Sequence, residues 1–198
     1  MKQFSLFVIS LLFFSITLHA QDTTTTNLPY AEIPDYPETY TAGSVVARLI
    51  DGLGFRYYWA TEGLRDEDLQ YKPSEKGRRC EETIDHIYDL SRVIVNATTK
   101  TINDPTIEQP EMNYAEKRKK TLENFKKARN ILLKSNDLTD FKVVFKGKEK
   151  NTEFPFWNNI NGPIADAIWH TGQVVLLRRA SGNPFNSKVS VLTGKVRS

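Results

Sequence analysis

Three polar side chains near the C-terminal end of the chain have a spacing suited to metal or acid–base chemistry. Within residues 161–184, Asp166, His170 and Gln173 fall on one side of a helix with 3.6 residues per turn. The carboxylate and the imidazole stand one helical turn apart on a mainly apolar stripe. Polar groups in such a setting are costly unless they are satisfied, and a divalent metal ion would satisfy them well.

A second histidine lies on the apolar side of an earlier predicted helix. Of the three histidines, His19 belongs to the N-terminal apolar segment, which leaves His86 and His170 for the fold. His86 shares its side of the helix with Ile87, and Glu82 precedes it by one turn. Taken alone, His86 has two interpretations. It is either a hydrogen-bonded histidine of the core, which is the commoner case, or a metal ligand.

Composition describes a single globular domain. The 198 residues are 26% charged and 39% hydrophobic, which is usual for a soluble domain of this size. The formal net charge of +3 at pH 7 gives no argument for a polyanionic partner, so we expect no binding to nucleic acid. Cys80 is the sole cysteine, which excludes an internal disulfide.

The first twenty residues have the pattern of a signal peptide. Lys2 supplies a positive charge, residues 4–18 are uncharged and largely apolar, and Ala20 ends a plausible cleavage site. We therefore expect export, with a periplasmic or secreted mature chain that does not insert stably in a membrane. An uncleaved anchor is the alternative, which the short apolar segment disfavours. Residues 21–41, with a threonine run and three prolines, predict an extended N-terminal arm.

Hydrophobic periodicity predicts four helices, at about residues 43–63, 80–99, 113–134 and within 161–184. Gly52 and Gly54 weaken the first helix, and they would allow a neighbouring helix to approach closely. The third helix is rich in lysine and arginine. Such a face is usually solvated, although an acidic partner or an anionic membrane surface would also suit it.

The segment before the last helix changes from helical to alternating periodicity. Phe141, Val143 and Phe145 alternate with other residues, and a glycine- and lysine-containing turn follows. We predict an all-α fold over residues 42–184. It is a four-helix bundle with one long crossover before the last helix, and the crossover contains a short β-hairpin or extended segment. Residues 185–198 form a C-terminal tail.

Two stretches resemble the DinB-like (YfiT-like) superfamily of metal-binding four-helix bundles. KPSEKGRRCEETIDHIYDL at residues 72–90 resembles that family's connection into its second helix. DAIWHTGQ at residues 166–173 resembles the family's H-x3-H-x-G-Q signature. The aromatic end of the first helix precedes both at a fitting distance, and the likeness spans about residues 42–184.

The resemblance implies a divalent metal site in the bundle centre, with one ligand on the second helix and two on the fourth. His86 takes the first place and His170 the last, while Asp166 stands where the family has another histidine. The set remains a credible triad for Zn, Ni, Mn or Fe with open coordination positions. The resemblance also gives Glu82 the place of a base or of a group that orients a ligand, and gives Gln173 that of a hydrogen-bond partner. Arg79 or Cys80 replaces the Ser or Thr cap expected before the second helix.

Two functions follow from this resemblance. The first is a metal-dependent hydrolase or transferase acting on a small molecule, with a pocket walled by Tyr57, Tyr58, Trp59 and Trp169. Export argues against the thiol-dependent transfer known for some members, because low-molecular-weight thiols are cytosolic reagents. The alternative is a non-catalytic metal-binding or scaffold module. The family includes dimers, which leaves a homodimer open.

Overall fold

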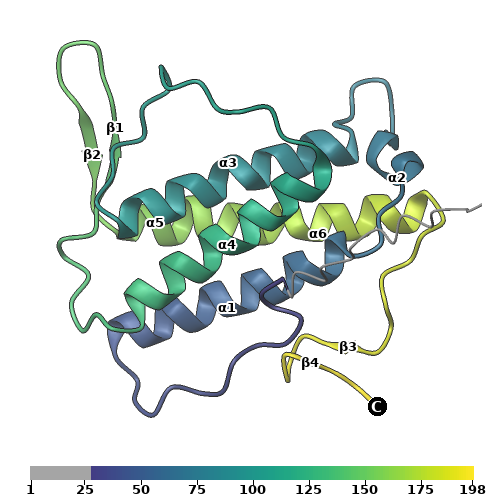
Figure 1. The fold of residues 1–198 in the computed structure, drawn as a ribbon, viewed down its shortest axis with the longest axis horizontal. Coiled ribbons are helices and arrows are strands. Elements are labelled where there is room, and N and C mark those ends of the chain that lie inside the picture. The colour runs from purple at the N-terminus through teal and green to yellow at the C-terminus, as the bar shows by residue number, and fades with distance from the viewer. Residues whose placement is uncertain (1–27) are drawn as a thin grey trace, which may run out of the picture.

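This computed structural model describes residues 28–198, and four long helices form its framework (Figure 1). They are α1 (Ala42–Thr61), α3 (Cys80–Thr98), α4 (Tyr114–Leu132) and α6 (Ala165–Ala180). The four predicted helices are thus confirmed, with ends within a few residues of those expected. The predicted signal peptide lies outside the described residues.

The long helices pack as a ring, in which α1 and α3 each contact both α4 and α6. Helices α3 and α4 run in the same direction. Lys117 pairs with Asp85 near their N-terminal ends, and Asn124 Nδ2 donates to Ser91 Oγ at 3.0 Å further along. Helices α1 and α6 run in the opposite direction (Figure 1).

This arrangement corrects the predicted crossover. Because α3 and α4 are parallel neighbours, residues 99–113 must return along the length of the bundle, and Figure 1 shows them doing so. The connection before α6 instead joins two helix ends on the same side of the bundle. It does contain the predicted hairpin, in which β1 (Val143–Phe145) pairs antiparallel with β2 (Thr152–Phe154). A second small hairpin, β3 (Val189–Ser190) with β4 (Lys195–Val196), lies in the C-terminal tail.

The core forms where the apolar stripes of the four helices meet. Thr41 starts α1 with a reciprocal capping box to Ser44, and this fixes where the stripe of α1 begins. The largest buried side chains come from all four helices and include Ile50, Leu53, Tyr57, Ile84, Ile87, Ile94, Leu122, Phe125, Leu132 and Val174. No helix in residues 28–198 has the length and apolar content needed to cross a bilayer.

Helix α6 follows a kinked start. A short turn, α5 (Trp157–Asn159), leads into a wide π-type turn over Ile160–Ile164. Within it Gly162 has φ −99° and ψ −105°, which are not helical values. Pro163 follows within this turn, and the regular helix α6 begins at Ala165. The kink thus lies at the start of the predicted segment 161–184, whereas helical backbone begins earlier, at Trp157.

The N-terminal arm packs on α1 from residue 28 onward. Tyr30 is buried against Gly54, and the Trp59 indole N–H donates to the Ala31 carbonyl at 3.0 Å. A Cβ on Gly54 would lie 2.5 Å from the Tyr30 ring. The expectation that Gly54 admits a neighbouring helix is therefore wrong, because the arm occupies that place. The tail joins the arm where the Ile33 N–H donates to the Gly194 carbonyl at 2.8 Å.

Candidate metal centre

His86, Asp166 and His170 come together where α3 packs against α6. One donor atom from each residue lies within 4.8 Å of the others. The Asp166 carboxylate stands between the two rings, with Oδ2 3.3 Å from His86 Nε2 and Oδ1 3.4 Å from His170 Nε2. The rings meet edge to face with centroids 4.6 Å apart. The fold thus unites two histidines that are far apart in sequence.

Helix α3 positions His86 through its N-terminal cap and its buried stripe. Ile84 and Ile87 anchor the helix in the core on either side of His86 in sequence. At the cap, the Arg79 N–H donates to Glu82 Oε2 at 2.7 Å, and Arg79 Nε donates to Glu82 Oε1 at 3.2 Å. The expected Ser or Thr cap is thus replaced by Glu82, whose carboxylate accepts from both the backbone and the side chain of Arg79.

The Glu82 carboxylate caps the N-terminal end of α3. The backbone N–H of Arg79 and the nearby guanidinium hold the pKa of Glu82 below its usual range. A carboxylate stabilised in its ionised form is a weak base. The proposed part of Glu82 as a base or orienting group therefore has no contact to support it in the described residues.

Helix α6 positions Asp166 and His170 one turn apart, just after the kink. Asp166 lies in the first turn of α6, where a negative charge is favourable for the helix dipole. The i, i+4 spacing puts both side chains on one face, toward His86.

Gln173 orients the ring of His170. His170 Nδ1 lies 2.7 Å from Gln173 Oε1. With the amide oxygen facing it, Nδ1 carries a proton and donates, which leaves Nε2 as the ring nitrogen that faces Asp166. Metal-ligating histidines commonly donate their other N–H in this way. The sequence prediction that Gln173 is a hydrogen-bond partner agrees with this contact.

The site opens to solvent between the two helices. The side chains of His86 and Asp166 are 35% and 36% exposed, and that of His170 is 16% exposed. The triad is thus at the surface of the α3–α6 pair, not sealed in the bundle centre as the resemblance implied. Trp169 is exposed and stacks on His170 with centroids 6.5 Å apart.

The other aromatic side chains expected to wall a pocket lie elsewhere. Tyr57 is fully buried and packs edge-on against Phe125 in the core. Trp59 holds the arm through Ala31, and Tyr58 packs edge-on against Trp59. Aromatic residues at helical spacing here serve the core and the arm, which is their commoner role.

The donor set fits a divalent metal ion. Donor atoms bound at about 2.0–2.1 Å to a tetrahedral ion lie about 3.3 Å apart. The two distances from histidine Nε2 to Asp166, 3.3 Å to Oδ2 and 3.4 Å to Oδ1, are close to this value, although they involve different carboxylate oxygens. A neutral His170 with its proton on Nδ1 would point a lone pair at a carboxylate oxygen. That contact is favourable only with a cation between the two atoms, either a proton on Nε2 or a metal ion. Two imidazoles and one carboxylate suit Zn, Ni, Mn or Fe.

A hollow of about 660 Å³ lies beside His170 and Gln173. Its walls come from α3, from α6 and from the connection after α1, which contains the short helix α2 (Asp66–Gln70). Sequence periodicity missed this hollow, because its walls come from segments that are far apart in sequence. Its lining residues are Tyr71, Pro73, Arg78, Thr83, His170, Gln173, Leu176, Leu177 and Ala180.

A buried polar network fixes the connection against the end of α6. Asp68 has no exposed side-chain surface, and it accepts hydrogen bonds from Arg65, Ser181 and Asn183. These donors, Arg65 first, hold the pKa of Asp68 well below its usual range. Arg178 donates from α6 to carbonyls at the end of α1, including that of Ala60 at 3.0 Å. The wall of the hollow is therefore rigidly supported.

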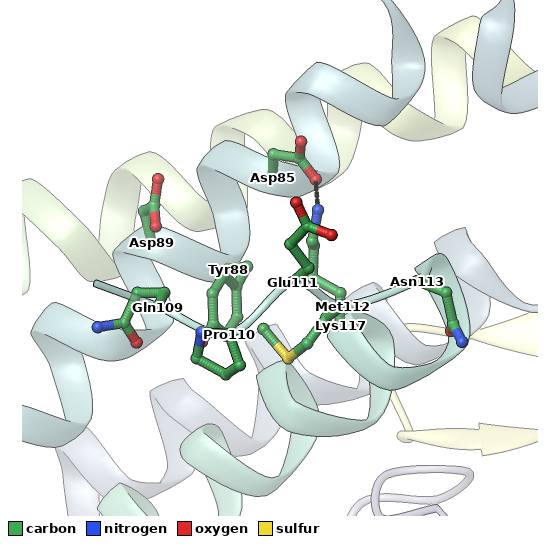
Figure 2. A pocket seen from close by; sticks show the side chains of 9 residues that line it. All are labelled: Asp85, Tyr88, Asp89, Gln109, Pro110, Glu111, Met112, Asn113 and Lys117. Atoms are coloured by element: carbon green, nitrogen blue, oxygen red, sulfur yellow. Dashed lines mark hydrogen bonds and ion pairs between the residues drawn. The ribbon is translucent and has the colours of Figure 1, made fainter. Parts of the chain in front are cut away.

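A second hollow, of about 620 Å³, lies between α3 and the residues that lead into α4 (Figure 2). Asp85, Asp89 and Glu111 give it an acidic lining, but Lys117 pairs with Asp85. Figure 2 shows this ion pair and the separate position of Asp89 further along α3. In residues 28–198 the triad brings three donor atoms from His, Cys, Asp or Glu side chains within 4.8 Å of one another, whereas these acids form no such cluster.

Comparisons with known proteins give no information on the chemistry of the triad. No protein-family model, no curated protein and no solved structure matches the chain. The possible metal ligands are therefore identified by their donor types, distances and exposure alone.

Proposed function

We propose that this chain binds one divalent metal ion through His86, Asp166 and His170 and acts as a metal-dependent hydrolase or transferase on a small molecule. The observation that carries the proposal is the convergence of three donor atoms within 4.8 Å from two different helices. The adjoining hollow of about 660 Å³ offers space for a substrate next to His170. The resemblance to DinB-like bundles in residues 72–90 and 166–173 belongs to the same proposal.

Three protein ligands leave open positions on a zinc-like ion, and such an ion lowers the pKa of a bound water enough to make it a nucleophile. The chain's own residues prepare this chemistry. Gln173 holds the proton of His170 on Nδ1, and Asp166 supplies the negative charge that offsets part of the charge of the ion. The partial exposure of His86 and Asp166 keeps the site accessible from solvent.

A non-catalytic module is the second candidate, and one contact favours it. Asp166 already contacts both imidazoles, so protonated histidines would satisfy the triad without a metal. In that case the polar cluster would only join α3 to α6. A scaffold of this kind would hold no metal, so metal content, which is directly measurable, separates it from a metal-binding chain.

The test is the metal content of the purified chain, measured by inductively coupled plasma mass spectrometry. An Asp166→Ala/His170→Ala variant and an Asp89→Ala control are measured beside it. Asp89 is an exposed acid of α3 that lines the second hollow. We expect one divalent ion per chain in the wild type and in the control, and none in the double variant. Absence of metal from the wild type after incubation with Zn²⁺, Ni²⁺, Mn²⁺ and Fe²⁺ would favour the non-catalytic module. Loss of the bound metal in the Asp89 variant alone would indicate that the metal binds in the acidic hollow instead of at the triad.

A further inference from the structure

The hollow beside His170 has one positive charge opposite an apolar wall. Arg78 is its only lining residue with a permanent charge, and no carboxylate lines it. Tyr71, Pro73, Leu176, Leu177 and Ala180 give it a mainly apolar surface. A volume of about 660 Å³ is within the usual range for sites that bind small organic molecules.

The guanidinium of Arg78 is available for a ligand. Arg78 is exposed, and among residues 28–198 no hydrogen bond or ion pair engages its side chain. Its neighbour Arg79 differs, because Glu82 and Gln70 both accept from that guanidinium. An arginine presents a planar set of donors that matches a carboxylate or a phosphate group.

A further donor and an uncovered apolar surface lie on the α6 side of the hollow. Gln173 uses its oxygen toward His170, so its amide NH₂ group remains for a ligand. Leu176, one turn further along α6, is 64% exposed although it belongs to the wall of the hollow. An apolar ligand chain lying on this wall would cover Leu176 and gain the burial free energy.

We infer that the hollow binds a small organic anion with an apolar body. Its carboxylate or phosphate group pairs with Arg78, its apolar part lies along Tyr71 and Leu176, and its other end reaches His170. The inference rests on the proposed function only where it makes this ligand a substrate, with the reacting group at the His170 end. Binding of the anion itself depends on Arg78 and the apolar wall.

Calorimetric titration with three probes tests the inference: hexanoate, hexyl phosphate and 1-hexanol. We expect at least one of the two anions to bind the wild type about tenfold more tightly than hexanol, since only an anion can form a charge-assisted hydrogen bond with the Arg78 guanidinium. Arg78→Gln should abolish this preference. Lys76→Gln, a control that removes an exposed charge from the same connection outside the lining, should preserve it. Equal binding of hexanol and both anions, or an unchanged preference in Arg78→Gln, would overturn the inference.

Two further variants test separately the contact with the apolar part of the ligand and the dependence of anion binding on the metal. Leu176→Ser should weaken hexanoate binding while leaving the charge preference in place, and unchanged affinity would refute the apolar wall. Asp166→Ala should lose the metal yet keep the Arg78-dependent preference, because Asp166 does not line the hollow. Anion preference in a wild-type chain that takes up no metal would mean that the proposed function fails and this inference stands. Metal binding without anion preference would mean the reverse.

Discussion

His170 Nδ1 and Gln173 Oε1 lie 2.7 Å apart, one turn along the same helix. This contact orients the imidazole so that its other nitrogen faces Asp166 and His86. Because the three residues of α6 share one face, the helix itself provides both the ligands and the group that orients one of them. A site built in this way on regular helix is held by backbone geometry and needs no loop to order it.

We predict that Gln173→Leu lowers the metal affinity by about tenfold to a hundredfold, because the His170 ring loses the acceptor that fixes its orientation and its proton. Gln173→Glu keeps an acceptor at the same place and should retain most of the affinity. Competition with a chelating indicator for Zn²⁺ measures both values. Gln70→Leu is the matched control, since Gln70 contacts Glu81 and Arg79 away from the triad. Wild-type affinity in Gln173→Leu would show that the contact has no part in metal binding.

Much of the helical framework could be predicted from periodicity and caps. The start of α4 is one example, because Asn113 and Glu116 form a capping box before a clear apolar stripe. The β1–β2 hairpin is another, since Val143 and Phe145 alternate as a strand requires. These features depend on neighbours in sequence, so local reasoning is sufficient for them.

The features that were missed depend on contacts between distant segments. The parallel pairing of α3 and α4 is set by how the apolar faces meet in three dimensions, and no local pattern specifies it. The burial of Tyr30 against Gly54 and the role of Arg178 at the end of α1 are likewise tertiary. For the triad, spacing alone paired Asp166 with His170. The addition of His86 came from a resemblance, because periodicity shows only that His86 faces inward.

We predict that Cys80 is almost inert in the folded protein. Burial raises the pKa of its thiol to about 11, and the negative charge of Asp68 adds to this effect. Only the thiolate reacts with a disulfide reagent such as DTNB, so at pH 8 the reaction should be about a hundredfold slower than for a free cysteine. The same chain in guanidinium chloride should react fast and release one equivalent of chromophore. Fast reaction of the folded chain would show that the N-terminal end of α3 opens readily.

Asp68 should give the fold a distinct sensitivity to acid. Its folded-state pKa is depressed, mainly by the hydrogen bonds from Arg65, so its contribution is fully present above the unfolded-state pKa of about 3.9 and is lost as the pH falls below it. Asp68→Asn should lower the free energy of unfolding at pH 7 by about 2 kcal/mol. It should also make that free energy depend less on pH between about 4 and 2. Urea titrations at several pH values measure both effects.

The control for this experiment is Asp66→Asn, which removes an exposed carboxylate from the first turn of the same short helix. We expect it to change the free energy of unfolding by no more than about 0.5 kcal/mol at pH 7. An Asp68 variant that unfolds with the same free energy and pH dependence as the Asp66 variant would contradict a stabilising role for the buried network.

The docking of the arm on α1 predicts opposite effects for two glycines only two positions apart. A Cβ on Gly54 would lie 2.5 Å from the Tyr30 ring, so Gly54→Ala must displace a buried aromatic side chain and should destabilise the fold by about 1–3 kcal/mol. A Cβ on Gly52 meets only the end of the Arg56 side chain at 3.1 Å, which can move aside. Gly52→Ala should therefore stabilise α1 by up to about 1 kcal/mol, since alanine favours helix over glycine.

A double substitution shows whether Tyr30 is the cause. Tyr30→Ala alone removes a buried ring and should destabilise the fold. Once that ring is gone, the added methyl group at Gly54 has nothing to displace, so Gly54→Ala in the Tyr30→Ala background should be neutral or stabilising. The difference between its effects in the two backgrounds, measured by urea unfolding, is the coupling between arm and helix. Additive effects would mean that the arm does not occupy the space above Gly54 in solution.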